Sequence, residues 1–396
     1  MKSERRFKLL FIIQRYGVRV DGGAELYCRW LAEHLKSIYD ITVLTTCAED
    51  YTTWHNKYSE GQEDVNGVKV IRCSIDQPRS MDSFNLLTQK LLTRQRTMDE
   101  ERQWLLEQGP VSTNLLKTLH EIQHQFDYLF FFTYLYYPTV EGTALFPNKS
   151  VLVSTAHDEP VAHFQIYHEM YRRVRGLLFL TEAEQTFVNA VYDVQQTPQC
   201  LLGTGIDIPE ASITPAAFRK KYLIQRPYLL YIGRVDAGKG CSQLIDYFIE
   251  FQKTSEFNGI LAFAGRQHMI DPEHPDIKFL GFIPDGEIES AIHGSELILV
   301  PSSFESLSIL LLQGFSLGKP ALVNAGSKVL LNHCLSSNAG LFYSSQNEFS
   351  YGLELLLTHE KLKQRMGENA KQYIRSFYTW KLVENRLQSF LNALGE

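Results

Sequence analysis

The sequence predicts an α/β fold with two Rossmann-like, doubly wound domains. Short apolar runs of strand length alternate with amphipathic helical stretches almost throughout the chain. A second cycle of this alternation opens at residue 228, and 396 residues suit two or three domains. Two such parallel sheets facing each other would direct their strand carboxyl ends toward a central cleft, where ligands of open α/β sheets bind.

The first cycle of elements occupies the N-terminal half of the chain. The apolar run 7–13 predicts a buried strand, residues 24–36 an amphipathic helix, and residues 41–45 the next strand. Residues 81–125 are polar and favour helix, with a break at Gly109-Pro110, and predict an insertion of two helices. Further strands are expected near 128–132, 151–154, 177–180 and 199–202, with a helix at 182–191.

The second cycle follows a junction expected near 208–226. This junction comprises the segment 203–209 and a short charged helix at 215–221. Beyond it, strands are expected at 228–232, 259–264, 277–280, 297–300 and 321–323, and residues 346–393 are expected to be nearly all helix. The two domains are therefore placed at 1–207 and 226–378.

Composition excludes several classes of protein. Hydrophobic residues make up 44% and charged residues 21%, which disfavours disorder and coiled coil. The net charge of −6, with 39 basic and 45 acidic residues, argues against a nucleic-acid binder. The six Cys are scattered without a C-x-x-C pair, so neither a disulfide framework nor a zinc knuckle is indicated.

Hydropathy predicts a soluble, cytoplasmic protein. No 18 apolar residues run together, and the run 7–13 is too short for the core of a signal peptide. Peripheral association with the inner face of a membrane stays open.

The loops that follow strands carry the candidate site residues. In the first such loop, Gly22 and Gly23 stand directly before a helix, where backbone N–H groups and the helix dipole can face a phosphate. A simple tight turn is the alternative.

The loop after the strand 228–232 contains two cations. Gly233, Gly238 and Lys239 fit the spacing of a P-loop, but Gly240 stands where that motif needs a Ser or Thr hydroxyl for magnesium. The P-loop interpretation is therefore disfavoured. Arg234 and Lys239 could instead bind a diphosphate leaving group without metal, or form a solvated basic turn.

The loop after the strand 297–300 presents Glu305. Its carboxylate could accept hydrogen bonds from sugar hydroxyls, and it could also cap the following helix. Gln313, two turns along that helix, could hydrogen-bond a ribose.

Several motifs in serial order resemble the family 4 glycosyltransferases, which are retaining enzymes of the GT-B fold. The resemblance covers about 20 to 340 and is strongest from 228 to 324. The matching pieces are Gly22-Gly-Ala-Glu25, Gly203-Thr-Gly-Ile-Asp207, Gly233-Arg234 with Lys239-Gly240, Phe263-Ala-Gly265, Gly281-Phe-Ile-Pro284, and the Glu305 loop ending in Gly318-Lys-Pro320.

The resemblance implies roles for the residues that match. Arg234 and Lys239 would bind the donor diphosphate, and Glu305 the donor sugar, with Ser306 and Leu307 in the same binding loop. The loop of Gly22 and Gly23 would close on the phosphate side from the opposite domain. Base contacts would come from the backbone near Gly265, Arg266, Phe282 and Ile283.

The chain differs from the family at one position of the donor site. The resemblance also extends to a histidine and to the last helix. The second glutamate of the family is here Gln313, whose neutral amide lacks the strong charged acceptor. His157 matches a histidine placed near the transferred sugar; by itself it would be an ordinary loop histidine, and Asp158 and Glu159 beside it could assist an acceptor hydroxyl. The helix 379–396 is expected to cross back to the first domain.

A metal site is not expected. His120 and His124 have the i, i+4 spacing of metal ligands, but no third ligand is in view on their polar helix, so a solvated face is favoured. There is also no Asp-x-Asp motif.

Together with these motifs, the resemblance implies a retaining, metal-independent glycosyltransferase of the hexosyltransferase type. It would move a sugar from a UDP-, GDP- or ADP-sugar, which is a co-substrate rather than a cofactor, to a hydroxyl of a glycan or lipid-linked acceptor in polysaccharide or cell-envelope glycan biosynthesis. The catalytic residues would be Glu305, His157, Arg234 and Lys239. Acceptor specificity is expected in 81–125 and 134–137. The alternatives are a non-catalytic sugar-nucleotide-binding protein, or an epimerase or phosphorylase of the same fold.

Overall fold

The computed structural model describes residues 6–207 and 210–395 and divides the chain into two compact units. Unit 1 comprises Met1–Thr204 with Val383–Glu396, and unit 2 comprises Gly205–Leu382. Residues 1–5, 208, 209 and 396, which the expected domains and junction include, lie outside the described residues. The two units are described one at a time.

Unit 1 contains an eight-stranded sheet in the order β3-β4-β2-β1-β5-β6-β7-β8. Every neighbouring pair is parallel except the hairpin of β3 and β4. The strands are β1 (Lys8–Ile12), β2 (Asp40–Thr46), β3 (Gly61–Val65), β4 (Val68–Cys73), β5 (Tyr128–Phe132), β6 (Ser150–Val153), β7 (Gly176–Phe179) and β8 (Gln199–Leu201).

The central strands of this sheet are continuous apolar runs. All five residues of β5, YLFFF, are buried, as expected of a parallel strand that is covered on both faces. The helices of unit 1 are α1 (Gly23–Leu35), α2 (Met81–Leu92), α3 (Met98–Gln108), α4 (Thr113–Ile122), α5 (Tyr137–Leu145), α6 (Gln165–Arg173), α7 (Glu182–Tyr192) and α15 (Trp380–Gly395). An apolar core of this unit lies between the sheet and helices α2 to α7.

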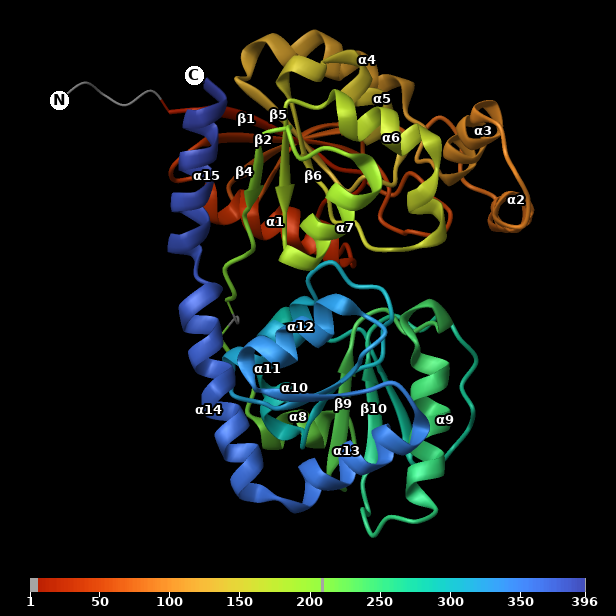
Figure 1. Cartoon of the computed structure of the whole chain (residues 1–396), viewed down its shortest axis with the longest axis vertical. Coiled ribbons are helices and arrows are strands. Elements are labelled where there is room, and N and C mark those ends of the chain that lie inside the picture. Colours follow the sequence, from red (N-terminus) through yellow and green to blue (C-terminus); the bar gives the residue numbers. More distant parts are fainter. Residues whose placement is uncertain (1–5, 208–209, 396) are drawn as a thin grey trace, which may run out of the picture. The chain divides into compact units, whose positions relative to one another are not determined.

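Residues 81–125 form three helices rather than the predicted two. The break at Gly109 separates α3 from α4, as predicted, but a second break precedes α3, which begins with a capping box between Thr97 and Glu100. α4 packs against β2 and β4, whereas α2 and α3 pack on each other. Figure 1 shows α2 and α3 projecting at the side of the unit.

Unit 2 contains a six-stranded, wholly parallel sheet in the order β11-β10-β9-β12-β13-β14. The strands are β9 (Tyr228–Ile232), β10 (Ile260–Ala264), β11 (Ile277–Gly281), β12 (Ile298–Val300), β13 (Ala321–Asn324) and β14 (Gly340–Tyr343). The helices are α8 (Pro215–Lys221), α9 (Cys241–Gln252), α10 (Asp285–Gly294), α11 (Ile309–Ser316), α12 (Lys328–Ser337), α13 (Gln346–Thr358) and α14 (Glu360–Phe377). A second apolar core belongs to this unit alone.

The segment expected to be the junction packs as part of unit 2. Helix α8 lies against α10, where Lys221 Nζ contacts Glu287 Oε1 at 2.6 Å. Unit 2 therefore begins at Gly205, earlier than the expected 226, because α8 has its own packing partner.

The last helix, α15, packs on unit 1. Val383, Leu387 and Leu391 are buried, and Phe390 lies so close to Gly176 of β7 that a Cβ there would be 2.7 Å from its ring. The chain thus returns to unit 1 after completing unit 2.

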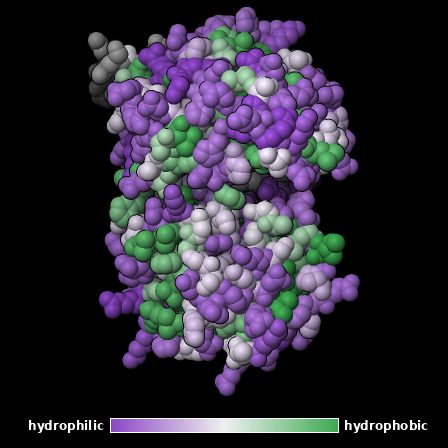
Figure 2. Space-filling view, turned by 45° about the vertical axis from the view of Figure 1, so that its right-hand side comes forward, coloured by the Kyte–Doolittle hydropathy of each residue, from purple (hydrophilic) through white to green (hydrophobic). Residues whose placement is uncertain are grey.

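The molecular surface is mainly polar on the face drawn in Figure 2, where hydrophobic residues form small separate groups. Within residues 6–207 and 210–395, no helix combines the length and the apolar character needed to cross a bilayer.

Candidate active site

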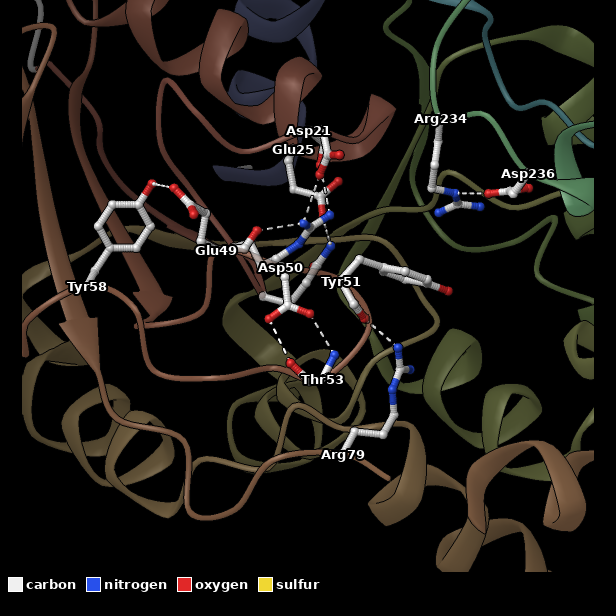
Figure 3. Close-up of polar contacts among 12 residues, drawn as sticks. Asp21, Glu25, Glu49, Asp50, Tyr51, Thr53, Tyr58, Arg79, Arg234 and Asp236 are labelled. Carbon is white, nitrogen blue, oxygen red and sulfur yellow. Dashed lines mark hydrogen bonds and ion pairs between the residues drawn. The ribbon is translucent and has the colours of Figure 1, made fainter. Parts of the chain in front are cut away.

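The loop after β9 holds Arg234 and Lys239 by hydrogen bonds to Asp236. The Arg234 guanidinium pairs with one carboxylate oxygen of Asp236, as Figure 3 shows, and the other oxygen accepts the backbone N–H of Lys239 at 2.8 Å. Asp236 thereby caps the short 3-10 turn of residues 237–239. One carboxylate therefore holds the guanidinium of Arg234 and the backbone of Lys239.

Lys239 and Glu305 form an ion pair in unit 2. Lys239 Nζ lies 2.8 Å from Glu305 Oε1, and the two side chains are 31% and 16% exposed. They come from the loops after β9 and β12, which are neighbouring strands in the sheet. Because the carboxyl ends of parallel strands share one edge, this pair lies where open α/β sheets bind ligands.

The loops after β9 and β10 are joined backbone to backbone. Gly233 N–H donates to Ala264 O at 2.9 Å, and Val235 N–H donates to Arg266 O at 2.9 Å. Gly265 has φ of +142°, and a Cβ there would be 1.8 Å from Gly233 O. Only glycine allows this close approach.

The remaining residues predicted to contact the base follow the next strand. Gly265 N–H donates to Gly281 O at 2.8 Å, which brings the end of β11 beside the loop after β10. Phe282 is half exposed and Ile283 is buried. The predicted base contacts at Gly265, Arg266, Phe282 and Ile283 therefore follow two paired strands.

The Glu305 loop leads into α11 without a side-chain cap. Ser308, with φ of +65°, stands at the N-cap, and no side chain caps this helix. The interpretation of Glu305 as a helix cap is therefore wrong, and its carboxylate faces Lys239 instead. Leu307 and Gln313 are both buried in this segment, and Ser306 lies between Glu305 and Leu307.

A buried histidine that the sequence analysis did not single out holds this loop. His333 of α12 bonds the carbonyl of Leu307 through Nε2 at 3.0 Å and the hydroxyl of Tyr373 through Nδ1 at 3.0 Å. Nε2 is therefore the donor, and Nδ1 accepts from tyrosine. Burial lowers the pKa of His333 to about 4, against the raising effects of Leu307 and Glu305, so the ring is neutral at physiological pH.

In unit 1, the glycine loop before α1 rests on a buried ion pair. Glu25 Oε1 accepts from Arg15 Nη2 at 2.7 Å and from Gln14 Nε2 at 2.8 Å. Gly22 has φ of +127°, and a Cβ there would be 2.2 Å from Glu25 Oε2, whereas a Cβ on Gly23 would meet nothing within 4 Å. Burial lowers the pKa of Arg15, but Glu25 and Asp21 outweigh it and raise the pKa overall.

A second buried arginine of unit 1, Arg79, donates to the backbone carbonyl of Tyr51, as Figure 3 shows. Arg79 donates through Nε to Thr52 O at 2.8 Å and through Nη1 to Gln108 Oε1 at 2.7 Å. Arg15 and Arg79 both stack on Trp54, with their guanidinium carbons 5.9 and 4.9 Å from a ring centroid. The sequence gives no motif for Arg79, since its partners Thr52 and Gln108 are 27 and 29 residues away. Arg15 instead pairs with Asp21 and Glu25, six and ten residues further along the chain.

His157 lies in the loop after β6 of unit 1. Its Nδ1 is 3.6 Å from Glu159 Oε1, which accepts the hydroxyl of the buried Tyr134. Asp158 instead pairs with His163, at 2.9 Å.

His120 contacts the ring of Phe146 at 5.9 Å, and the described residues contain no group of three or more His, Cys, Asp or Glu that could hold a metal ion.

The predicted residues thus fall into two groups, one in each unit. In unit 2, hydrogen bonds or ion pairs link the loops of Arg234, Lys239, Glu305 and Gly265. In unit 1, Gly22 and Gly23 lie at the start of α1, and His157 lies on a separate loop. Arg15 and His333 were missed, because each is a single polar residue within an otherwise ordinary loop or amphipathic segment.

Comparison with known proteins gives a family match in unit 2. Residues 216–373 match the model of the family described as glycosyl transferases group 1. The chain is 27% identical over 202 residues to an alpha-D-kanosaminyltransferase from Streptomyces kanamyceticus, covering 46% of this chain and 49% of that protein.

Two further relatives differ in how much of them is matched. Glycosyltransferase 1 domain-containing protein 1 from Xenopus tropicalis is 28% identical over 111 residues, which cover 28% of this chain and 31% of that protein. An uncharacterized glycosyltransferase from Methanocaldococcus jannaschii is 20% identical over 399 residues, covering 94% of this chain and 95% of that protein.

Solved structures match the whole chain. A sucrose-phosphate synthase from Thermosynechococcus elongatus has a TM-score of 0.70 at 15% identity, covering 98% of this chain and 99% of that one. HepE from Anabaena, solved with UDP and glucose, has a TM-score of 0.70 at 16% identity, covering 98% and 100%. The predicted fold class is confirmed: the chain has the α/β GT-B fold of two Rossmann-like domains.

Proposed function

We propose that the protein is a glycosyltransferase that moves a sugar from a nucleotide-diphosphate sugar to a hydroxyl group. The observation that carries this proposal is the ion pair of Lys239 and Glu305, with Arg234 on the same loop, at the carboxyl edge of a parallel sheet. The match of residues 216–373 to group 1 glycosyl transferases supports it. HepE, a structural neighbour, is solved with UDP and glucose, which supports a nucleotide sugar as the donor.

Lys239 and Arg234 would stabilise the leaving diphosphate. Breaking the anomeric bond adds negative charge to the diphosphate, so fixed cations stabilise the transition state more than the ground state. An ammonium group has three N–H donors, and the contact of Lys239 with Glu305 uses one of them. Lys239 can therefore bind a phosphate oxygen while it keeps Glu305 in place.

Glu305 would orient the donor sugar. Lys239 engages Oε1 at 2.8 Å, and a carboxylate has further lone pairs on both oxygens for sugar hydroxyls. Because His333 holds the carbonyl of Leu307, two residues further along, the loop that presents Glu305 is braced from α12. This preorganisation reduces the reorganisation needed during transfer.

The roles proposed for unit 1 rest on the family resemblance and on local geometry. A Cβ at Gly23 would enter open space, and the backbone N–H groups beside it at the N-terminus of α1 are proposed to face a phosphate. His157 is proposed to contact the transferred sugar. Its partner Glu159 is itself fixed by Tyr134.

The finer features of the reaction are also proposals. We expect retention of the anomeric configuration, a hexosyl group as the transferred sugar, independence of metal ions, and a glycan or lipid-linked acceptor of polysaccharide or cell-envelope biosynthesis. The expected place of action is the cytoplasm, where docking to the inner face of a membrane would bring the enzyme to a lipid-linked acceptor. Proton NMR of the product and turnover in excess EDTA test retention and metal independence.

The test of this function is the substitution Lys239→Ala. The donor is first identified by a thermal-shift screen of UDP-, GDP- and ADP-sugars, because ligand stabilisation follows affinity. Removing the cation should then lower kcat with that donor by at least ~100-fold, a loss of about 3 kcal/mol of transition-state stabilisation.

The matched control is Lys253→Ala, which removes the same charge from an exposed lysine of unit 2 that pairs with Glu250. The control should keep the wild-type rate. Unchanged turnover in Lys239→Ala would refute the role in diphosphate binding.

A second candidate function is favoured by one residue. Gln313 replaces the charged acceptor that the resembled family has at this position, as expected of a non-catalytic protein that binds sugar nucleotides. Calorimetric donor binding without hydrolysis or transfer across many acceptors would support this alternative over catalysis. Phosphate-dependent product formation would instead identify a phosphorylase, and interconversion of sugar epimers an epimerase.

A further inference from the structure

A fully buried carboxylate in unit 1 joins the loops after two neighbouring strands. Glu184, in the first turn of α7, accepts the backbone N–H of Ala156 through Oε1 at 2.9 Å and that of Leu180 through Oε2 at 2.7 Å. Ala156 directly precedes His157 in the loop after β6, and Leu180 directly follows β7. Its side chain also accepts hydrogen bonds from the backbone N–H of Thr181, the N-cap of α7, and from the side chain of Ser154.

The loop that Glu184 holds contains a strained residue. Thr155 has φ of +52°, a left-handed conformation that a β-branched residue rarely adopts. Such a residue persists only where its surroundings fix it. The bond from Ala156 N–H to Glu184 fixes the backbone immediately after Thr155, at the point where the chain turns toward His157.

We propose that Glu184 is a positioning residue for His157, whose loop it holds in place through the backbone N–H group of Ala156. This inference rests on the proposed function where it concerns transfer by His157. Glu184 touches neither His157 nor, in the proposal, the substrate, so its effect is exerted through the loop.

Ionisation of Glu184 makes this positioning dependent on pH. Burial raises the pKa of Glu184 to about 7, against the lowering effect of the N–H groups of Leu180 and Ala156. The titratable groups that face it are Tyr27 of α1 and Tyr171 of α6, whose pKa values burial raises well above 10, so both stay neutral. A carboxylate accepts both N–H groups, whereas a protonated carboxyl presents a hydroxyl to one of them and weakens that bond.

The substitution Glu184→Gln tests this role, because glutamine resembles the protonated carboxyl in shape. Its NH₂ group would face a backbone N–H, so one of the two bonds is lost at every pH. Glu182→Gln is the matched control, since Glu182 is exposed on the same turn of α7 and loses the same charge.

Hydrogen exchange by mass spectrometry measures the loop directly on the full chain. In Glu184→Gln, exchange of peptides covering 154–160 should be ~10-fold faster than in wild type when both are measured at pH 8. In Glu182→Gln it should follow wild type. Equal protection in wild type and Glu184→Gln would overturn the proposal.

Turnover gives the second measurement, with UDP-glucose hydrolysis as the probe reaction. Glu184→Gln should lower kcat ~10-fold or more with little change in KM, because the donor residues Arg234 and Lys239 are in unit 2. The rise of kcat with pH through about 7 should be present in wild type and in Glu182→Gln and absent in Glu184→Gln.

The two measurements separate failure of this inference from failure of the proposed function. If wild type turns over no nucleotide sugar, the proposed function fails while the exchange measurement still decides the role of Glu184. A Glu184→Gln protein with lowered thermal stability, wild-type exchange at 154–160 and a wild-type pH profile would show a merely structural role and overturn the inference.

Discussion

Gln313 belongs to the proposed donor site, and there the chain differs from the family it resembles, which has a glutamate at this position. It is buried in α11, eight positions after Glu305, and its amide is neutral. Replacing it by glutamate, Gln313→Glu, should strengthen binding of the nucleoside diphosphate of the donor. A charged acceptor makes hydrogen bonds to ribose hydroxyls roughly twice as strong, so we expect Kd to fall ~3- to 10-fold by calorimetry.

The control for this prediction is Gln372→Glu, which adds the same charge at an exposed position of α14. The thermal midpoint must be measured beside Kd, because an unpaired buried carboxylate is destabilising. Weaker binding by a Gln313→Glu protein that retains its thermal midpoint would show that Gln313 does not face the ribose.

At the scale of elements, His333 connects α12 to the Glu305 loop, and protonation of its ring makes the stability of the fold depend on pH. Its pKa is about 4 in the folded chain and 6.5 in the unfolded chain, so the unfolded chain binds more protons between these values. Its stabilising contribution is therefore complete above pH 6.5 and is lost as the pH falls toward 4. The loss amounts to at most about 3 kcal/mol of unfolding free energy.

Urea denaturation of the full chain between pH 4 and 7 measures this contribution. The pH dependence should be smaller in His333→Gln than in wild type, and His359→Gln, at an exposed histidine of the same unit, should behave as wild type. Equal slopes in wild type and His333→Gln would contradict the assignment of a neutral, buried ring.

Sequence patterns predicted the elements with strong apolar periodicity and missed those without it. β1, β5 and β9 are buried on both faces and were predicted within one or two residues as apolar runs. β3 was missed because its sequence, GQEDV, lies exposed at the sheet edge and carries no apolar signal. α5 was missed because Tyr137-Pro-Thr-Val is apolar and β-branched, a composition that does not favour a helix.

The same distinction applies to the candidate site. Lys239 and Glu305 could be singled out because each lies in a loop directly after an apolar strand, and the parallel sheet brings such loops to one edge. Glu184 and His333 bond backbone groups 28 and 26 residues away, and no local pattern encodes these bonds. The local pattern at Glu184 is the Thr181-x-x-Glu184 spacing of a capping box, which indicates only the start of α7. Hydrogen bonds between single residues far apart in the chain therefore could not be predicted from the sequence.

At the scale of the whole molecule, the last helix stabilises unit 1, although it follows unit 2 in the sequence. α15 follows unit 2 in sequence, but Leu387 is fully buried within unit 1. Leu387→Ala should destabilise unit 1 by about 2–5 kcal/mol, the range for a leucine removed from a packed core. Scanning calorimetry should show one transition moved to lower temperature and the other in place, because each unit has its own core.

Binding of a nucleotide sugar identifies which transition belongs to which unit. A donor that binds unit 2 raises only that transition, by mass action, so the transition lowered in Leu387→Ala must be the one that the donor does not raise. Asn385→Ala, at an exposed position of the same helix, should leave both transitions unchanged. A shift of both transitions in Leu387→Ala would mean that the two units unfold together. In that case α15 would stabilise both units and not unit 1 alone.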